Sequence, residues 1–385
     1  MIIFRELPTG EFELDRESLN TIITPNGIIE KIAQSNEHIF TSVDNKKGAN
    51  AKFWINNANI SDKDLLLFKT SINDPAKGKR ASYYGELVVD LICHFTGFPH
   101  TSYYPCKVIK VDGTELEGTL SPNYKDKDCD LEFSVDNIKS RFEKYMYDNN
   151  NGMVPPIPLN TVYGYIAQID IMYGQFMQPG KLEEIKNYLL MLALLDFVTM
   201  QIDRHGGNIC MQFDSKKGIG SSIQYIPAFD SECICGFDDD LIKVLQRARD
   251  YKARTATGST APFEKTAASK KQAPLLGIRT SIVELTSNGM MVSRKYKDGE
   301  SSNIEIITKE LVDELLINPE LMDFYKKLKN LKLQELMESL GGYFPEEIIY
   351  LATNLFEYRI KMLEQELKKR GYKNEEDDQD DRDIR

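Results

Sequence analysis

Two aspartates and an asparagine stand in one stretch of the chain, between Leu194 and Glu232. Asp203 and Asn208 are five positions apart in a Gly-containing loop that follows an apolar, helix-like segment. Two strand-like runs come next and predict a hairpin, with Asp230 at the end of the second run. In phosphoryl transfer, one carboxylate orients the attacking hydroxyl and accepts its proton, while an amide and a second carboxylate hold Mg²⁺ against the phosphates of ATP. The residue types and their order therefore favour kinase chemistry.

This chemistry also needs a cation on the phosphates and a carboxylate that holds the cation in place. Lys69 ends the apolar run LLLFK, which is typical of a buried strand. Glu86 follows 17 positions later, on a segment with apolar residues at helical spacing that Gly97 ends. The spacing allows the two side chains to meet, like the strand lysine and helix glutamate of protein kinases. Upstream, Gly48 stands in a polar turn whose backbone amides could cover the phosphates.

Taken singly, each of these residues also has an ordinary structural explanation. Asp203 and Asn208 could cap backbone groups in a turn, and Lys69 could be a surface lysine of an edge strand. The joint order of Lys, Glu, Asp, Asn and Asp favours the catalytic interpretation. Arg204 could neutralise phosphate or be solvated, and Asp196 could brace the loop or cap polar backbone. The sequence leaves these two open.

The elements that must position these residues change character along the chain. From about Phe53 to Leu120 the pattern reads strand, strand, helix, strand, strand, with a hairpin at Asp112-Gly113 and Trp54 in the core. The charged, Asn-rich stretch Lys125–Gly152 is interpreted as a connection or insertion. Later segments are mostly helical. We expect a helix at Lys181–Met200 and a mobile loop at Lys252–Ala273. We also expect a helical block at Ile306–Arg370, with breaks at Asn318-Pro319 and Gly341-Gly342.

The sequence therefore predicts an α+β, two-lobed, protein-kinase-like fold. A small β-rich N-terminal lobe with one key helix would span residues 1–124 and carry the nucleotide loop, the lysine strand and the glutamate helix. A larger, mostly helical C-terminal catalytic lobe would span residues 125–370. Residues 371–385 would form an acidic, disordered tail, because seven of them are Asp or Glu.

Composition narrows the classes of partner. The chain has 385 residues, with 48 Lys and Arg against 59 Asp and Glu and a net charge of −11. This balance argues against direct binding to nucleic acid or to an anionic membrane. The start of the sequence has no basic and then apolar signal pattern, so we expect a cytoplasmic protein. The six cysteines are scattered, which favours buried reduced thiols over a disulfide framework or a metal site.

The motifs also carry a family resemblance. IDRHGGN followed by IPAFDSE resembles the D-x-H-x-x-N and P-x-x-D pattern of HipA-like serine/threonine kinases, and GANAKFWI resembles their nucleotide loop. LLLFK and GELVVDLICHFTG are similar to the lysine strand and glutamate helix of the family, so the resemblance covers roughly residues 48–230. It implies that Asp203 is the catalytic base and that Asn208 and Asp230 are Mg²⁺ ligands. It also implies that Lys69 binds the phosphates with Glu86 as its anchor, and that Gly48 and Lys52 belong to the nucleotide loop. GTLSPNY, at residues 118–124, falls where the hinge facing adenine would lie.

The resemblance implies an ATP- and Mg²⁺-dependent kinase that transfers the γ-phosphoryl group to a Ser or Thr hydroxyl of a protein, and that could phosphorylate itself. It also implies an antitoxin or another regulatory protein as a partner, as in toxin–antitoxin pairs. Full-length family toxins carry an extra N-terminal subdomain, whereas about forty residues precede the nucleotide loop here, so we expect the shorter, kinase-core type.

Two alternative functions stay open. A lipid or small-molecule kinase is the first, because the DRH-x-x-N pattern is shared with phosphoinositide kinases. The acidic composition argues against a lipid headgroup as substrate. A nucleotide-binding module without catalysis is the second, and the intact set of Lys69, Asp203, Asn208 and Asp230 argues against it.

Overall fold

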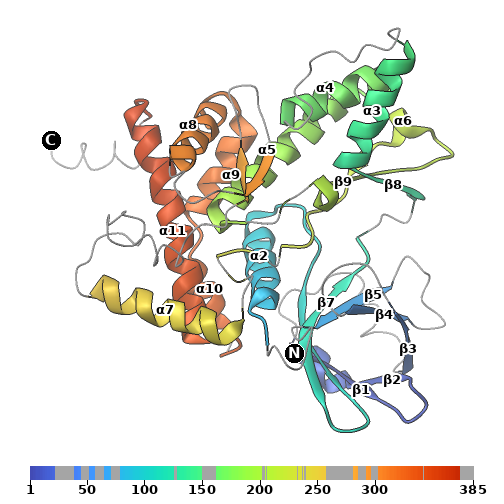
Figure 1. Ribbon diagram of the computed structural model, residues 1–385, viewed down its shortest axis with the longest axis vertical. Helices are drawn as coiled ribbons and strands as arrows, with labels where there is room; N and C mark the ends of the chain where they lie inside the picture. The colour runs from blue at the N-terminus through green and yellow to red at the C-terminus, as the bar shows by residue number, and fades with distance from the viewer. Residues whose placement is uncertain are drawn as a thin grey trace.

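The computed structural model describes residues 1–21, 39–44, 52–56, 65–70, 79–124, 128–149, 162–201, 204, 206–231, 233–235, 237, 240–256, 281–284, 292–295, 302–340 and 342–372. Two residues of the predicted site, Gly48 and Asp203, lie outside this part of the chain. Figure 1 shows strands gathered in the N-terminal region and helices in most of the rest. The fold is therefore α+β, as the sequence predicts.

Seven strands close into a barrel near the N-terminus (Figure 1). Their order around the barrel is β1-β2-β3-β4-β5-β7-β6. Neighbouring strands are antiparallel except β1 and β6, which run parallel and close the barrel. The strands are β1 (Ile2–Glu6), β2 (Phe12–Leu14), β3 (Ile39–Asp44), β4 (Lys52–Asn56), β5 (Leu66–Thr70), β6 (Tyr104–Ile109) and β7 (Glu115–Pro122).

Alternate residues of these strands fill the barrel with an apolar core, because successive side chains of a strand point to opposite faces. Ile55 belongs to this core and Phe53 packs against it. Trp54 lies between them, points to the other face and is half-buried, so the prediction that it is a core residue is wrong. The first three strands, which a short 3₁₀ helix η1 (Arg16–Thr21) accompanies, are not predicted from the sequence.

Helix α2 (Ser82–Thr96) lies between the barrel and the C-terminal helices (Figure 1). It ends at Gly97 as predicted, where a φ of 76° lets the N–H of Gly97 bond back to the Cys93 carbonyl. The apolar residues of α2 belong to the same buried cluster as those of the C-terminal helices. The ring of Tyr84, for example, lies 5.7 Å from the ring of Phe344, centroid to centroid. The helix that carries Glu86 is thus packed against the C-terminal half of the chain.

The Asn-rich stretch Lys125–Gly152, interpreted as a connection or insertion, contains a strand and a helix, so it is more than a connection. β8 (Leu131–Ser134) pairs with β9 (Cys210–Phe213), and β9 pairs with β10 (Gln224–Tyr225). The pairing of β9 with β10 confirms the predicted hairpin, whose connection contains α6 (Ile219–Ser222). α3 (Val135–Asn149) follows β8. Three apolar residues at a spacing of four form its buried face, and the charged residues between them conceal this pattern: Ile138, Phe142 and Met146.

The predicted helices of the C-terminal half are present. α5 (Lys181–Thr199) ends within one residue of the expected boundary, and the two expected breaks separate helices of the later block. The remaining elements are α4 (Val162–Tyr173), η3 (Gly174–Phe176), η4 (Gly206–Asn208), α7 (Leu241–Ala256), β11 (Ser281–Glu284), β12 (Val292–Lys295), α8 (Ser302–Ile317), α9 (Pro319–Lys329), α10 (Leu333–Ser339) and α11 (Glu346–Lys369). Within the described residues, no helix has the length and apolar character needed to cross a membrane.

Three smaller predictions have different outcomes. The loop expected at Lys252–Ala273 is wrong at its start, because α7 continues to Ala256 and the Lys252 ammonium pairs with Glu346 of α11. Residues 257–273 lie outside the described part, as do residues 373–385 of the acidic tail. All six cysteines are buried thiols, as expected.

Candidate active site

Lys69 lies at the centre of a cluster of charged side chains from distant parts of the chain. It stands on β5, and its Nζ donates to Oε1 of Glu86 at 2.8 Å and to Oδ1 of Asp230 at 2.6 Å. Glu86 is 17 positions away along the chain and Asp230 is 161. The Lys69 side chain is only 11% exposed, so two carboxylates hold its ammonium in one place. The contact between Lys69 and Glu86 that the spacing predicts is present.

Glu86 is buried, with 1% of its side chain exposed. Its second carboxylate oxygen, Oε2, accepts a hydrogen bond from Thr119 Oγ1. Thr119 stands on β7 directly opposite Lys69 on β5, and residues opposite each other in an antiparallel pair point to the same face. Glu86 therefore binds two adjacent barrel strands at once. Because a buried carboxylate without partners would be costly, this pairing fixes the orientation of Glu86 and, through it, of Lys69.

Asp230 has a backbone conformation that is uncommon for a residue with a side chain. Its φ is 55°, in the left-handed region. Side chains from two other segments hold both of its backbone polar groups: its N–H donates to Tyr103 Oη at 2.9 Å, and its carbonyl accepts from Gln201 Nε2 at 3.3 Å. These bonds stabilise the turn that directs the Asp230 carboxylate towards Lys69.

The charges around Asp230 keep its carboxyl group ionised. Burial alone would raise the pKa of Asp230, but Lys69, followed by Lys52 and Arg204, outweighs burial and lowers the pKa below its usual value. Lys52 on β4 stands directly opposite Lys69 in the barrel, so both lysines belong to one face of the wall. Two ammonium groups near one carboxylate make a place suited to anionic groups such as phosphates.

Arg204 and Asp196 form a buried ion pair behind Asp230. Arg204 is 2% exposed, its Nε lies 3.0 Å from Asp196 Oδ2, and its Nη2 lies 3.1 Å from Oδ1. The guanidinium also donates to the Phe229 carbonyl at 2.7 Å and to Ser231 Oγ at 3.1 Å. Burial raises the pKa of Asp196, and Arg204 opposes this rise without cancelling it. Arg204 thus braces the residues on both sides of Asp230. Because it is buried, it is not the solvated residue that the sequence leaves open as one of its two roles.

The structure places five of the seven predicted site residues in its described part. Lys69, Glu86, Lys52 and Asp230 form the cluster above. Asn208 ends η4 and is 7% exposed, four residues after Arg204. The predicted hinge, residues 118–124, contains the second half of β7, and the ring of Tyr124 stacks on that of Phe229 at 4.7 Å.

These residues fit Mg²⁺ and the phosphates of a nucleotide in chemical type. Asp230 supplies a carboxylate that its neighbours keep ionised, and Asn208 supplies an amide oxygen. Oxygen atoms are the ligands that Mg²⁺ prefers, with phosphates and water completing its coordination. Within the described residues, no group of three His, Cys, Asp or Glu side chains is arranged to hold a metal.

The chain as a whole resembles solved structures of other proteins. The chain resembles a Helicobacter pylori proinflammatory kinase, CtkA, with a TM-score of 0.45 and 13% identity, over 85% of this chain and 96% of that one. It also resembles HipA of a Shewanella oneidensis toxin–antitoxin system, solved with HipB and operator DNA, with a TM-score of 0.41 and 10% identity, over 83% of this chain and 64% of that one.

The sequence identities to both of these kinases are low. A Plasmodium vivax ethanolamine kinase is a more distant match, with a TM-score of 0.22 and 11% identity over 89% of this chain and 86% of that one. No protein-family model and no curated protein sequence matches this chain.

Three residues of the cluster are absent from the sequence prediction: Thr119, Tyr103 and Gln201. Each forms a hydrogen bond with a predicted residue, and only Thr119 lies in a quoted motif, GTLSPNY, where no role in holding Glu86 is predicted for it. Thr119 could have been found from strand pairing, because it stands opposite Lys69 once β5 and β7 are known to be neighbours. Tyr103 and Gln201 carry no signal in the sequence that distinguishes them from core residues.

Proposed function

We propose that this chain is an ATP- and Mg²⁺-dependent kinase that transfers the γ-phosphoryl group to a Ser or Thr hydroxyl of a protein, and that it can phosphorylate itself. One observation carries the proposal: the Lys69 ammonium lies between the Glu86 and Asp230 carboxylates. A lysine on a strand, anchored by a helix glutamate and facing a second carboxylate, is the arrangement that kinases use on nucleotide phosphates. A core that needed only to be stable would not require two carboxylates on one ammonium.

Each residue has a separate role in this proposal. Lys69 neutralises phosphate charge, and Glu86 keeps the ammonium in place before and after the nucleotide binds. Asn208 and Asp230 hold Mg²⁺, and the bound metal neutralises charge that develops on the phosphates. Gly48 and Lys52 belong to the nucleotide loop and the strand that follows it. Asp203 orients the acceptor hydroxyl and takes its proton.

The organisation of the chain follows from the same proposal. Residues 1–124 form the smaller lobe of a two-lobed kinase, residues 125–370 form the catalytic lobe, and residues 371–385 form the acidic tail. Lys69 comes from the first lobe and Asp230 from the second, so ATP would bind where the two lobes meet. A protein substrate fits the net charge of −11 better than an anionic lipid surface does. An antitoxin or other regulatory protein partner stays a prediction.

Incubation of the purified chain with γ-labelled ATP, Mg²⁺ and a cell lysate tests the function. Label should enter protein bands, at phosphoserine or phosphothreonine, and Lys69→Met should abolish it. Lys107→Met is the matched control, because Lys107 is also a strand lysine paired with a glutamate, at 2.7 Å from Glu115, but on the exposed face. Label in a small molecule or lipid would replace the protein-kinase proposal with the first alternative. Absence of label in any product, with ATP bound, would favour a non-catalytic module.

A further inference from the structure

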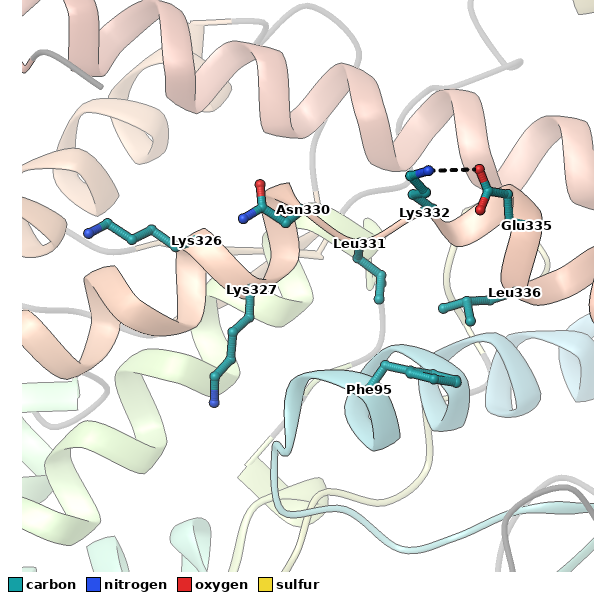
Figure 2. Close-up of a pocket in the computed structure, with 8 residues that line it drawn as sticks. All are labelled: Phe95, Lys326, Lys327, Asn330, Leu331, Lys332, Glu335 and Leu336. Atoms are coloured by element: carbon teal, nitrogen blue, oxygen red, sulfur yellow. Dashed lines mark ion pairs between the residues drawn. The ribbon is translucent and has the colours of Figure 1, made fainter. Parts of the chain in front are cut away.

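A surface groove of about 520 Å³ lies among the ends of α2, α9 and α10, and none of the described site residues lines it. Figure 2 shows Phe95 of α2 beneath Leu331 and Leu336, with two lysines at one end of the groove and an ion pair at the other. The lining residues are Phe95, Lys326, Lys327, Asn330, Leu331, Lys332, Glu335 and Leu336.

The groove combines an apolar floor with a basic rim. Phe95 is 52% exposed, which is unusual for a phenylalanine, and Leu331 and Leu336 are half-buried beside it. Three lysines and one glutamate line the groove, so its charge is positive on a chain whose net charge is −11. Such a surface attracts a segment that is acidic and carries an apolar side chain.

Structural roles explain only some of the lysines that line the groove. Lysines in the last turn of α9 stabilise the helix end, and Lys327 Nζ donates to the Thr96 carbonyl at the end of α2. These roles do not explain Lys332, which precedes α10. Its ion pair with Glu335 joins side chains that are 73% and 67% exposed, so it contributes little and can be exchanged for another partner. Neither do they explain the exposed ring of Phe95.

The described chain ends near α9, whose last turn contributes Lys326 and Lys327 to the groove. Gly371, with a φ of 80°, turns the chain at the end of α11, and the N–H of Tyr372 donates back to the Leu367 carbonyl at 3.0 Å. Glu364, near the end of α11, pairs with Lys329 in the last turn of α9, with its Oε1 3.2 Å from Lys329 Nζ. The end of α11 therefore lies close to the turn of α9 that carries Lys326 and Lys327.

The next thirteen residues, KNEEDDQDDRDIR, match the groove in charge and length. They carry seven acidic and three basic side chains, and Ile384 is their one apolar residue. At about 3.3 Å per residue, thirteen extended residues reach roughly 40 Å, well beyond the short path from Lys326 to Leu336. Tethering to the same chain gives the segment a high effective concentration, so weak ion pairs are enough to hold it.

We infer that residues 373–385 dock in this groove of their own chain, with acidic side chains on Lys326 and Lys332 and with Ile384 against Phe95. The segment then lies on the end of α2, the helix that carries Glu86. The groove is closed to other acidic segments while it is occupied.

Photo-crosslinking in the full chain tests this inference. A photoreactive phenylalanine analogue at position 95 should, after irradiation and proteolysis, be joined to a peptide from residues 373–385. The same analogue at Phe176 of η3, which is 60% exposed in a separate groove, should not be. Mixing isotopically heavy and light chains shows whether the joined peptides come from one chain. Crosslinks between heavy and light chains, equal yields at positions 95 and 176, or no peptide from 373–385 would each overturn the inference.

Charge reversal supplies a second, independent measurement. Lys326→Glu with Lys332→Glu should lower the crosslink yield at position 95 severalfold, and added salt should do the same in the unchanged chain. Lys144→Glu, at an exposed lysine of α3, should leave the yield unchanged. Replacing Glu375, Glu376, Asp377 and Asp378 by Lys in the double-Glu variant should restore it. A crosslink yield that stays the same in all these variants and at all salt concentrations would overturn the electrostatic part of the inference. Melting curves of the variants are the folding control.

Discussion

The hydroxyl of Tyr103 accepts a hydrogen bond from the backbone N–H of Asp230 at 2.9 Å, across 127 positions of sequence. Tyr103 is buried, and burial raises its pKa, so the phenol stays neutral at physiological pH. The bond holds a residue whose φ of 55° carries a conformational cost. Tyr103 thereby connects the start of β6 to the carboxylate that faces Lys69.

Tyr103→Phe should therefore disturb Asp230 more than the surrounding core. The variant keeps the ring but leaves the Asp230 N–H without its acceptor, which should lower the free energy of unfolding by about 1–3 kcal/mol. Tyr165→Phe, another buried tyrosine, is the matched control for loss of a phenol oxygen. As a positioning residue, Tyr103 should also affect the Mg²⁺ concentration that gives half-maximal phosphorylation, and Tyr165→Phe should not. An unchanged Mg²⁺ requirement with lowered stability would leave Tyr103 a purely structural role.

Asp196→Asn should be strongly destabilising. It removes one partner of a buried ion pair and leaves the Arg204 guanidinium buried without its charge partner. Such changes typically cost about 3–5 kcal/mol of unfolding free energy. Urea unfolding measures the loss, and Asp313→Asn, which breaks a largely exposed pair with Arg370, should cost far less. Equal losses for the two variants would contradict the bracing role of Arg204.

The Lys69 and Asp230 pair should make stability depend on pH in acid. The pKa of Asp230 is lowered in the folded state, so the pair stabilises the fold fully above the unfolded-state pKa of about 3.9 and loses this effect as the pH falls through the lower folded value. The difference in unfolding free energy between the unchanged chain and Asp230→Asn should therefore shrink below about pH 4. A difference that stays constant from neutral to acid pH would show that the pair does not lower the pKa of Asp230.

Asp230→Asn should also weaken the effect of Mg²⁺ on nucleotide binding. A ligand that binds only the folded state raises the melting temperature, so Mg²⁺ with ATP should stabilise the unchanged chain more than ATP alone does. In Asp230→Asn this extra stabilisation should be smaller. Equal melting curves with and without Mg²⁺ in the unchanged chain would contradict the metal assignment.

The sequence predicts best those parts whose signal is local. The helix at residues 82–96 and the hairpin at Asp112-Gly113 follow from apolar period and turn chemistry, and both are confirmed. The contact of Lys69 with Glu86 follows from spacing and element order. Closure of the barrel does not, because β1 pairs with β6 about a hundred residues later, and strand pairing at that range leaves no periodic pattern.

The parts of the site that sequence reasoning misses are hydrogen bonds between distant residues. Nothing near Arg204 indicates that it would bind Asp196, since a charged residue in a loop is usually solvated. Burial of the pair depends on the packing of α5 and of the residues around Asp230, which only the folded chain brings together. The same holds for Tyr103 and Gln201, whose partners are backbone groups and not side chains that a motif could specify.

The rate of phosphoryl transfer by Asp203→Asn tests the central claim most directly. The substitution keeps nearly the same shape but removes the charge and the proton acceptor, so the rate should fall by about 10²–10⁴-fold. The affinity for Mg²⁺ and ATP should change little, because the proposal assigns their binding to Lys69, Asn208 and Asp230, and circular dichroism should show an unchanged fold. If Asp203→Asn phosphorylated its protein substrate at a near-normal rate, the catalytic assignment of IDRHGGN would be wrong and the loop would be a structural turn.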